Sequence, residues 1–178
     1  MYRISDLIKS DRKLFHTNDL ALLWKISNKN TLYTTIKRYV GKGVLIPIYK
    51  GLYSTAPVAL LNPLELGRAI IHSYAYLTTE SVLAQAGIIT QATYAYTFAA
   101  SRSTKVAAGP FSFIFRRLKD EFLYNPAGIV NDGGIFIATP ERAVADMLYF
   151  NPRYHFDFSQ SIDFEKVRRI QEEIGYPC

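Results

Sequence analysis

Cysteine is almost absent from this sequence, and its scarcity excludes two kinds of site. The single cysteine, Cys178, leaves no pair for an internal disulfide and no cluster of thiolates for zinc. The histidines His16, His72 and His155 lie far apart, with no second metal ligand at a suitable spacing. We therefore expect no metal and no other cofactor, and a chain suited to the reducing cytoplasm.

A long apolar run is also missing. The longest uncharged stretch, residues 81–101, has Gln85 and Thr90 near its middle and is interrupted by Gly87. Residues 1–13 carry a charge every few positions, which is unlike a signal peptide. We therefore expect neither export nor a membrane partner, and we expect a cytoplasmic protein.

Acidic residues are scarce in the first third of the chain. Residues 1–56 hold ten basic and three acidic side chains, a net charge of +7, whereas the remainder has a net charge of −1. No carboxylate side chain occurs between Ala21 and Thr55. Because phosphates repel carboxylates and attract cations, this distribution indicates a nucleic-acid partner for the first third alone.

The same third has the apolar pattern of three helices. A stripe that starts at Ile4 and can extend to Phe15 predicts a first helix. Thr17 is placed to cap a second helix, with Asp19 in its first turn, where negative charge is favourable. A third helix is expected over residues 29–40.

Two short strands are expected directly after these helices. They cover residues 44–49 and 52–55 and would be joined at Lys50 and Gly51 as a compact hairpin. Three helices followed by a hairpin predict a winged helix-turn-helix domain over residues 1–56.

The third helix separates into an apolar and a polar face. Its apolar residues are Leu32, Ile36 and either Tyr39 or Val40. If Leu32, Ile36 and Val40 are taken as buried, a rotation of about 100 degrees per residue places short polar groups and a guanidinium opposite them. Such groups can bind base edges in the major groove, and lysines can bind phosphates. The residues expected to read bases are Asn30, Thr31, Thr34, Thr35 and Arg38. The remaining residues of the predicted DNA-binding site are Asn28, Lys29, Lys37, Lys42 and Lys50.

Other interpretations of this module stay open. The basic surface can be merely solvated, and a three-helix module with a hairpin can bind protein instead of DNA. Tyr33 and Tyr49 could donate to phosphates, but we expect them to be core residues with their hydroxyls at the edge. DNA binding is favoured because the polar face lacks carboxylates.

After Pro57 the composition becomes neutral and aromatic, which predicts a second domain over residues 57–178. The predicted fold class is α+β, with an N-terminal winged helix-turn-helix followed by a mixed α/β domain that contains a small sheet. Helices are expected over residues 64–75, 78–87, 140–150 and 163–174. Strands are expected over residues 93–100, 111–118 and 134–138.

Residues 74–124 are rich in aromatic side chains, and two explanations are available. Rings that alternate along a strand fill a sheet core, which we favour. Alternatively, the rings could form a platform for single-stranded nucleic acid together with nearby cations. Those cations are Arg102, Lys105, Arg116, Arg117 and Lys119.

Three motifs resemble catalytic sites but have simpler explanations, so we expect no enzyme. Glu141 at a helix start favours the helix dipole, and Arg142 with Asp146 has the spacing of an ordinary ion pair on a helix. Residues 131–134 resemble a turn and lack the helix start of a phosphate-binding loop. Residues 119–121 are expected to be a solvated loop.

Three segments together resemble the AbiEi antitoxin family of type IV toxin-antitoxin and abortive-infection systems. They are GVLIPIYKGLYST at the hairpin, YLTTESVLAQAGIIT, and IFIATPERAVADML, of which ATPERAVADML is the most specific.

This resemblance implies a repressor of its own operon that binds repeats in its promoter, an arrangement compatible with a homodimer, and that opposes a nucleotidyltransferase-like toxin. It also implies that antitoxicity need not involve a stable complex with that toxin. The alternative is an antitoxin that sequesters the toxin directly and uses the winged helix as an interaction module.

Overall fold

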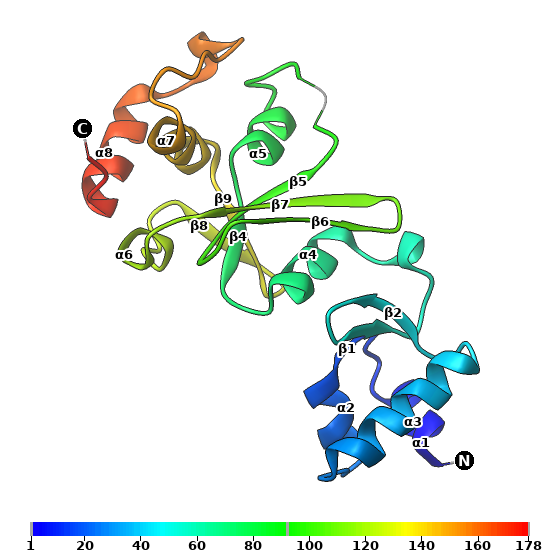
Figure 1. Ribbon diagram of the computed structural model, residues 1–178. Coiled ribbons are helices and arrows are strands. Elements are labelled where there is room, and N and C mark those ends of the chain that lie inside the picture. Colours follow the sequence, from blue (N-terminus) through cyan, green and yellow to red (C-terminus); the bar gives the residue numbers. More distant parts are fainter. Residues whose placement is uncertain (1, 92, 178) are drawn as a thin grey trace. The chain divides into compact units, whose positions relative to one another are not determined.

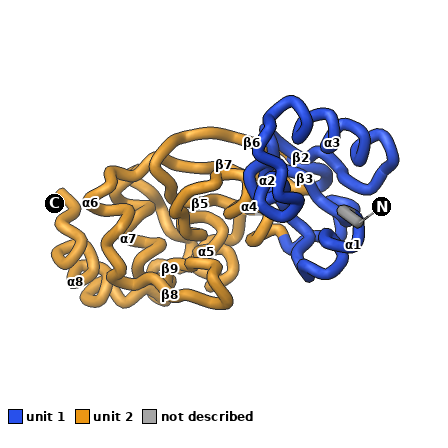
Figure 2. The backbone as a smooth tube through the Cα atoms, turned by 90° about the horizontal axis from the view of Figure 1, so that it is seen from below, with its two compact units in different colours: residues 1–62, 108–110 blue, residues 63–107, 111–178 orange. Residues whose placement is uncertain are grey.

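A computed structural model describes residues 2–91 and 93–177, so Cys178 lies outside the described residues. The chain forms two compact units, coloured separately in Figure 2. The N-terminal unit comprises residues 1–62 with 108–110, and the C-terminal unit comprises residues 63–107 with 111–178. Within the described residues there are eight α-helices, one sheet of three strands and one of six, so the fold is mixed α/β.

The N-terminal unit packs three helices against a small antiparallel sheet (Figure 1). The helices are α1 (Tyr2–Lys9), α2 (Thr17–Leu23) and α3 (Lys29–Gly41). The strands are β1 (Leu14–His16), β2 (Ile46–Tyr49) and β3 (Leu52–Ser54), in the order β1-β3-β2. The core of this unit comprises Leu7, Phe15, Leu20, Trp24, Ile26, Leu32, Ile36, Tyr39 and Leu45.

The first helix ends earlier than its apolar stripe suggests. Phe15 is buried, but it lies in β1 and pairs with Tyr53 of β3. The prediction that α2 is capped by Thr17 is also wrong, since His16 occupies the capping position. The carboxylate of Asp19 accepts the His16 backbone N–H at 2.8 Å, so an acid in the first turn does stabilise this helix start.

The C-terminal unit is built on a six-stranded sheet of order β6-β7-β5-β4-β9-β8. Its strands are β4 (Ala75–Leu77), β5 (Tyr96–Ala100), β6 (Thr104–Ala108), β7 (Phe111–Arg117), β8 (Ile129–Asp132) and β9 (Ile135–Ala138). Strand pairs β5–β7 and β4–β9 are parallel, whereas β4–β5 and β8–β9 are antiparallel. The strands β4, β6 and β8 are not among those expected from the sequence, and Ala75 of β4 lies at the end of the helix expected over residues 64–75.

Five helices accompany this sheet. They are α4 (Pro63–Ile71), α5 (Glu80–Gln85), α6 (Asp120–Leu123), α7 (Pro140–Phe150) and α8 (Phe164–Ile174), with a short 3₁₀ turn at Ser159–Ser161. A second 3₁₀ turn, Val58–Leu60, belongs to the N-terminal unit. Figure 1 shows α4 on one side of the sheet and α5 with α7 on the other. The predicted helix over residues 64–75 ends at Ile71, and the loop expected over residues 119–121 is partly helical in α6.

The aromatic side chains of β5 and β7 form a sheet core, as their alternation predicts. Phe98, Phe113 and Phe115 are each 1% exposed, and the rings of Phe98 and Phe115 stack with centroids 5.5 Å apart. Gly67 of α4 lets the helix approach these rings, since a Cβ there would lie 2.7 Å from Phe98. Buried rings cannot stack on bases, so the single-strand platform has no support from these three residues.

The described residues were expected to contain neither a membrane-spanning helix nor a metal site. No helix there is long and apolar enough to cross a membrane. No group of three or more histidine, cysteine, aspartate or glutamate side chains in the same residues is arranged to hold a metal ion.

Candidate nucleic-acid interface

Helix α3 carries most of the predicted contact residues, and local interactions define its ends. The Asn28 side chain caps the helix by accepting the Thr31 backbone N–H at 3.0 Å. The backbone N–H of Lys42 donates to the Arg38 carbonyl at 3.1 Å at the other end. Asn28 therefore acts as a helix cap, although its side chain is also exposed.

The buried face of α3 is rotated relative to the face that the sequence predicts. Tyr39 is buried and packs on Trp24, with ring centroids 5.3 Å apart, whereas Val40 is only partly buried. With about 100 degrees per residue, the observed buried face is turned by about 50 degrees from the predicted one. The rotation follows from the Trp24–Tyr39 contact, which places Tyr39 inward in place of Val40.

This rotation changes which side chains face solvent. Thr35 is 6% exposed, and its hydroxyl donates to the Thr31 carbonyl at 2.7 Å, so it does not lie on the outer face. Tyr33 is 56% exposed, and the prediction that it is a core residue is wrong. Tyr49 is half-buried, and it belongs neither to the core of this unit nor to the partly buried residues packed against that core.

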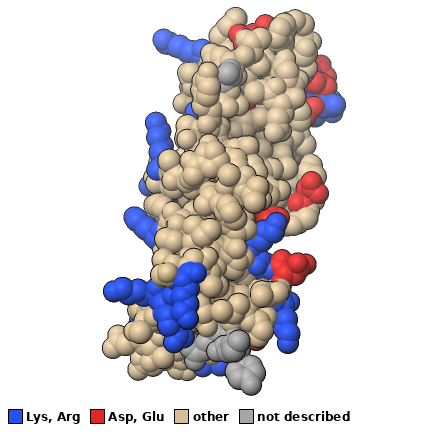
Figure 3. Space-filling view, turned by 90° about the vertical axis from the view of Figure 1, so that its right-hand side faces the viewer, with Lys and Arg blue, Asp and Glu red and all other residues tan. Residues whose placement is uncertain are grey.

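The other predicted contact residues lie at the surface. They are Asn28, Lys29, Asn30, Thr31, Thr34, Lys37, Arg38, Lys42 and Lys50, all exposed. Within the described residues none of the five cations among them takes part in an ion pair. Their charge is therefore not neutralised by a neighbouring carboxylate. Figure 3 shows lysine and arginine side chains gathered on the visible face of the N-terminal unit.

Two of these cations lie against tyrosine rings. The guanidinium carbon of Arg38 is 5.4 Å from the centroid of the Tyr39 ring. The Lys50 ammonium is 5.6 Å from the centroid of the Tyr49 ring. Such contacts restrict the rotamers of long side chains while leaving their charge exposed, which lowers the entropy lost when they bind a ligand.

The hairpin that carries Lys50 is fixed to the start of α2. Gly51 has φ +74°, a conformation that favours glycine, and its carbonyl accepts the Thr17 backbone N–H at 2.9 Å. Pro47 interrupts no ladder because β2 is an edge strand. The turn therefore holds Lys50 at the tip of the β2–β3 hairpin.

The hydroxyl groups of α3 are partly used within the helix. The Thr34 hydroxyl donates to the Asn30 carbonyl at 2.8 Å, and the Thr31 hydroxyl donates to the Asn28 side chain at 3.3 Å. Both oxygens can still accept a hydrogen bond from outside. Among the described residues, the donors on this face that make no hydrogen bond within the helix are consequently the Asn30 amide, the Tyr33 hydroxyl, Arg38 and the lysines.

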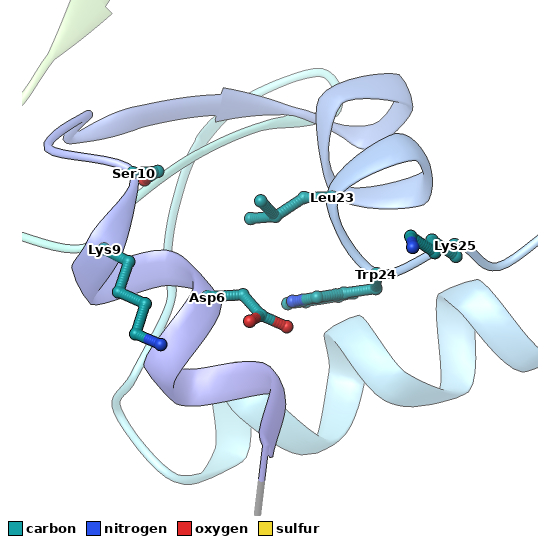
Figure 4. Close-up of a pocket in the computed structure, with 6 residues that line it drawn as sticks. All are labelled: Asp6, Lys9, Ser10, Leu23, Trp24 and Lys25. Carbon is teal, nitrogen blue, oxygen red and sulfur yellow. The ribbon is translucent and has the colours of Figure 1, made fainter.

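A shallow pocket of about 480 Å³ lies in the same unit, between α1 and α2. Figure 4 shows the carboxylate of Asp6 directed toward the Trp24 ring, and Leu23 lines the same pocket. Lys9, Ser10 and Lys25 complete the lining. The mixture of one acid and two lysines favours no single class of charged ligand.

A buried polar network in the C-terminal unit goes beyond what the sequence predicts. Arg142 and Asp146 do form the expected pair, Nε to Oδ1 at 2.8 Å, but both side chains are 0% exposed. Asp146 also accepts hydrogen bonds from the hydroxyls of Tyr76 at 2.9 Å, Thr78 at 2.7 Å and Tyr176 at 2.5 Å. The ordinary surface ion pair expected on α7 is therefore the centre of a buried network.

The remaining donors of Arg142 are also satisfied. They reach the Phe122 and Ala127 carbonyls at 3.0 and 2.8 Å and the Tyr76 hydroxyl at 2.7 Å. Burial, reinforced by the nearby Asp146 carboxylate, raises the pKa of the Tyr76 and Tyr176 phenols far above its usual value. The tyrosines thus remain donors, and the network joins β4, α6, α7 and the segment after α8.

One sequence signal could have revealed this burial. In α7, apolar residues surround Arg142 and Asp146 on every side of the helix, as the order ERAVADML shows. A helix that is apolar all round is a buried helix, so charged residues within it must find partners in the interior.

Comparison with known proteins shows the fold and no more. No protein-family model matches this chain, and no curated protein matches its sequence. Among solved structures, the chain is similar to the RV2827C protein from Mycobacterium tuberculosis, with a TM-score of 0.60 over 98% of this chain and 70% of that one. The two sequences are 13% identical, so the similarity establishes a shared mixed α/β arrangement.

Proposed function

We propose that the N-terminal unit is a winged helix-turn-helix that binds double-stranded DNA, and that the chain is a sequence-specific transcriptional regulator. Helix α3 enters the major groove, and the β2–β3 hairpin is the wing that contacts the neighbouring backbone. The observation that carries this proposal is the distribution of charge. Five exposed cations lie on α3, its C-cap and the hairpin tip, and none of them forms an ion pair with a described residue. The segment between Ala21 and Thr55 has no carboxylate side chain.

The exposed residues divide into two roles. The Asn30 amide and the Arg38 guanidinium can each make paired hydrogen bonds to a base edge, and Thr31 and Thr34 supply acceptors beside them. The lysines are point charges suited to phosphates and carry no sequence information. Those lysines are Lys29, Lys37, Lys42 and Lys50. Thr35 is left out of the proposed contacts because it is buried and its hydroxyl donates to the Thr31 carbonyl.

The biological setting is proposed from the resemblance to AbiEi antitoxins. The chain would act in the cytoplasm, without catalysis, as a repressor of its own toxin-antitoxin operon and an antagonist of a nucleotidyltransferase-like toxin. Inverted repeats in its promoter would be read by two copies of the chain, since a two-fold DNA site matches a two-fold protein arrangement.

The decisive experiment measures binding of the purified protein to a labelled fragment from upstream of its own gene. An unrelated fragment of equal length is the control, and salt is varied from about 50 to 200 mM. Four phosphate-binding lysines predict a slope of log K against log salt of about −3.6 per chain. Equal weak binding to both fragments, or none, would refute sequence-specific regulation.

The role of Arg38 is tested with a matched arginine. Arg38→Ala should weaken binding to the upstream fragment by about 1 to 3 kcal/mol and reduce the preference over the unrelated fragment. Arg169→Ala on α8 removes another exposed arginine and should change neither quantity. Unaltered binding by the Arg38 variant would remove this residue from the base-reading set.

A second candidate function, direct binding of the toxin, is favoured by a separate observation. Ile8 on α1 and Leu22 on α2 are 76% and 78% exposed, which is unusual for large apolar side chains. Co-purification of toxin and antitoxin after a high-salt wash would support this function. Loss of that complex in Leu22→Ser would identify α2 as the contact, whereas no complex at all would exclude it.

A further inference from the structure

Tyr33 is the large apolar side chain that α3 exposes. It lies in the second turn of the helix and is 56% exposed, while the inner face is filled by Leu32, Thr35, Ile36 and Tyr39. The Tyr33 hydroxyl forms no hydrogen bond with any described residue, and the Tyr33 ring contacts no other described aromatic ring. The Tyr33 ring is therefore not part of the core of the N-terminal unit.

The position of Tyr33 places it beside the groups proposed to contact DNA. Asn30 precedes it by three residues and Lys37 follows it by four, so all three share one stripe of the helix surface. The rotation of α3 caused by the Trp24–Tyr39 contact brings this stripe outward. In helix-turn-helix proteins, residues in the N-terminal part of the recognition helix contact base edges.

We propose that Tyr33 determines sequence specificity by packing its ring against the 5-methyl group of a thymine in the major groove. This inference rests on the proposed DNA binding. The major-groove edges of all four base pairs present hydrogen-bonding groups, and only thymine adds an apolar one. An exposed ring gains by leaving water only where it meets an apolar surface, and thymine supplies that surface among otherwise polar base edges.

The hydroxyl of Tyr33 offers a competing role, since it could donate to a phosphate. The two roles differ in which atoms matter. A thymine contact depends on the ring and survives removal of the hydroxyl, whereas a phosphate contact depends on the hydroxyl and is indifferent to the base. Tyr33→Phe and Tyr33→Ala therefore separate them.

The test uses the fragment from upstream of the gene in two forms, one with thymine and one with deoxyuridine throughout, which lacks the 5-methyl group. The parent should bind the thymine form about tenfold more tightly, and Tyr33→Phe should keep most of that ratio. Tyr33→Ala should bind the thymine form more weakly and discriminate less between the two forms. The quantity to compare is the ratio of the affinities for thymine and deoxyuridine DNA, measured for the parent and for each variant. Methyl groups that do not contact Tyr33 contribute equally to every ratio, so a difference between ratios reports the methyl contact of Tyr33 alone.

The controls distinguish the inference from the function on which it rests. Tyr94→Ala removes a tyrosine of the C-terminal unit that is 91% exposed, and it should leave the ratio unchanged. A Tyr33→Ala ratio equal to that of the parent, or Tyr33→Phe binding as weakly as Tyr33→Ala, would overturn the thymine contact alone. Failure of the parent to prefer the upstream fragment would overturn the proposed DNA regulation as well.

Discussion

Replacing Asp146 with asparagine tests whether the buried network stabilises the C-terminal unit. The carboxylate accepts hydrogen bonds from Arg142, Tyr76, Thr78 and Tyr176, and none of its surface reaches solvent. The asparagine side chain is almost the same size, but it would remove the charge that balances Arg142 and direct an NH₂ group at existing donors. The substitution therefore changes electrostatics and hydrogen bonding with little change in packing.

We expect Asp146→Asn to lower the free energy of unfolding by about 3 to 5 kcal/mol, the usual cost of leaving one buried charge without its partner. Tyr176→Phe removes one hydrogen bond to the charged group and should cost about 1.5 to 3 kcal/mol. Urea denaturation followed by far-ultraviolet circular dichroism measures both, since the single tryptophan, Trp24, lies in the N-terminal unit.

Glu141→Gln is the matched control for this experiment. It removes a negative charge from the residue before Arg142, but its side chain is 26% exposed and its contact with Lys166 is long, 3.9 Å. Its effect should be below about 1 kcal/mol. If Asp146→Asn destabilised the protein no more than this control, the network would not be the stabilising centre that its geometry indicates.

Three other outcomes are expected. Lys50→Ala should weaken binding to specific and unrelated DNA equally and reduce the salt slope by about 0.9, which fluorescence anisotropy measures; an unchanged slope would contradict a phosphate contact. Thr34→Val should weaken specific binding while Thr35→Val leaves it unaltered, because Thr34 is exposed and Thr35 is buried; equal losses would contradict the observed rotation of α3. Gly67→Ala should lower the thermal midpoint, at a cost of about 1 to 3 kcal/mol, because its methyl group would meet Phe98 at 2.7 Å, and an unchanged midpoint would show that the ring moves aside.

The starts of two helices could be predicted from the sequence, because capping residues lie within a few positions of the helix start. Thr139 and Pro140 predict the start of α7, and the Thr139 hydroxyl oxygen accepts the Arg142 backbone N–H at 3.2 Å, as a cap should. Helix α8 likewise begins after Asp163, whose side chain accepts the Lys166 backbone N–H at 3.1 Å. Caps act over three or four residues, so such signals can be read from the chain itself, although the cap of α2 lies one residue before the expected Thr17.

Short strands and helix rotation could not be read in this way. Leu14 and Phe15 continue a helical stripe in the sequence, but pairing with β3 makes them a strand. In α3, both Tyr39 and Val40 fit the apolar period, and only the packing of Trp24 on Tyr39 selects between them. That selection decides that Tyr33 is exposed and that Thr35 is buried.

By itself, the sequence determined the basic character of the first third, the exposed polar and cationic residues from Asn28 to Lys50 apart from Thr35, and the aromatic core of the sheet. These properties depend on composition and on periods of two to four residues. Only the tertiary structure decided the orientation of α3 and which groups Arg142 and Asp146 meet in the interior. The reason is distance along the chain: the hydroxyl of Tyr76 reaches Asp146 across 70 positions, and no local pattern encodes such a partner.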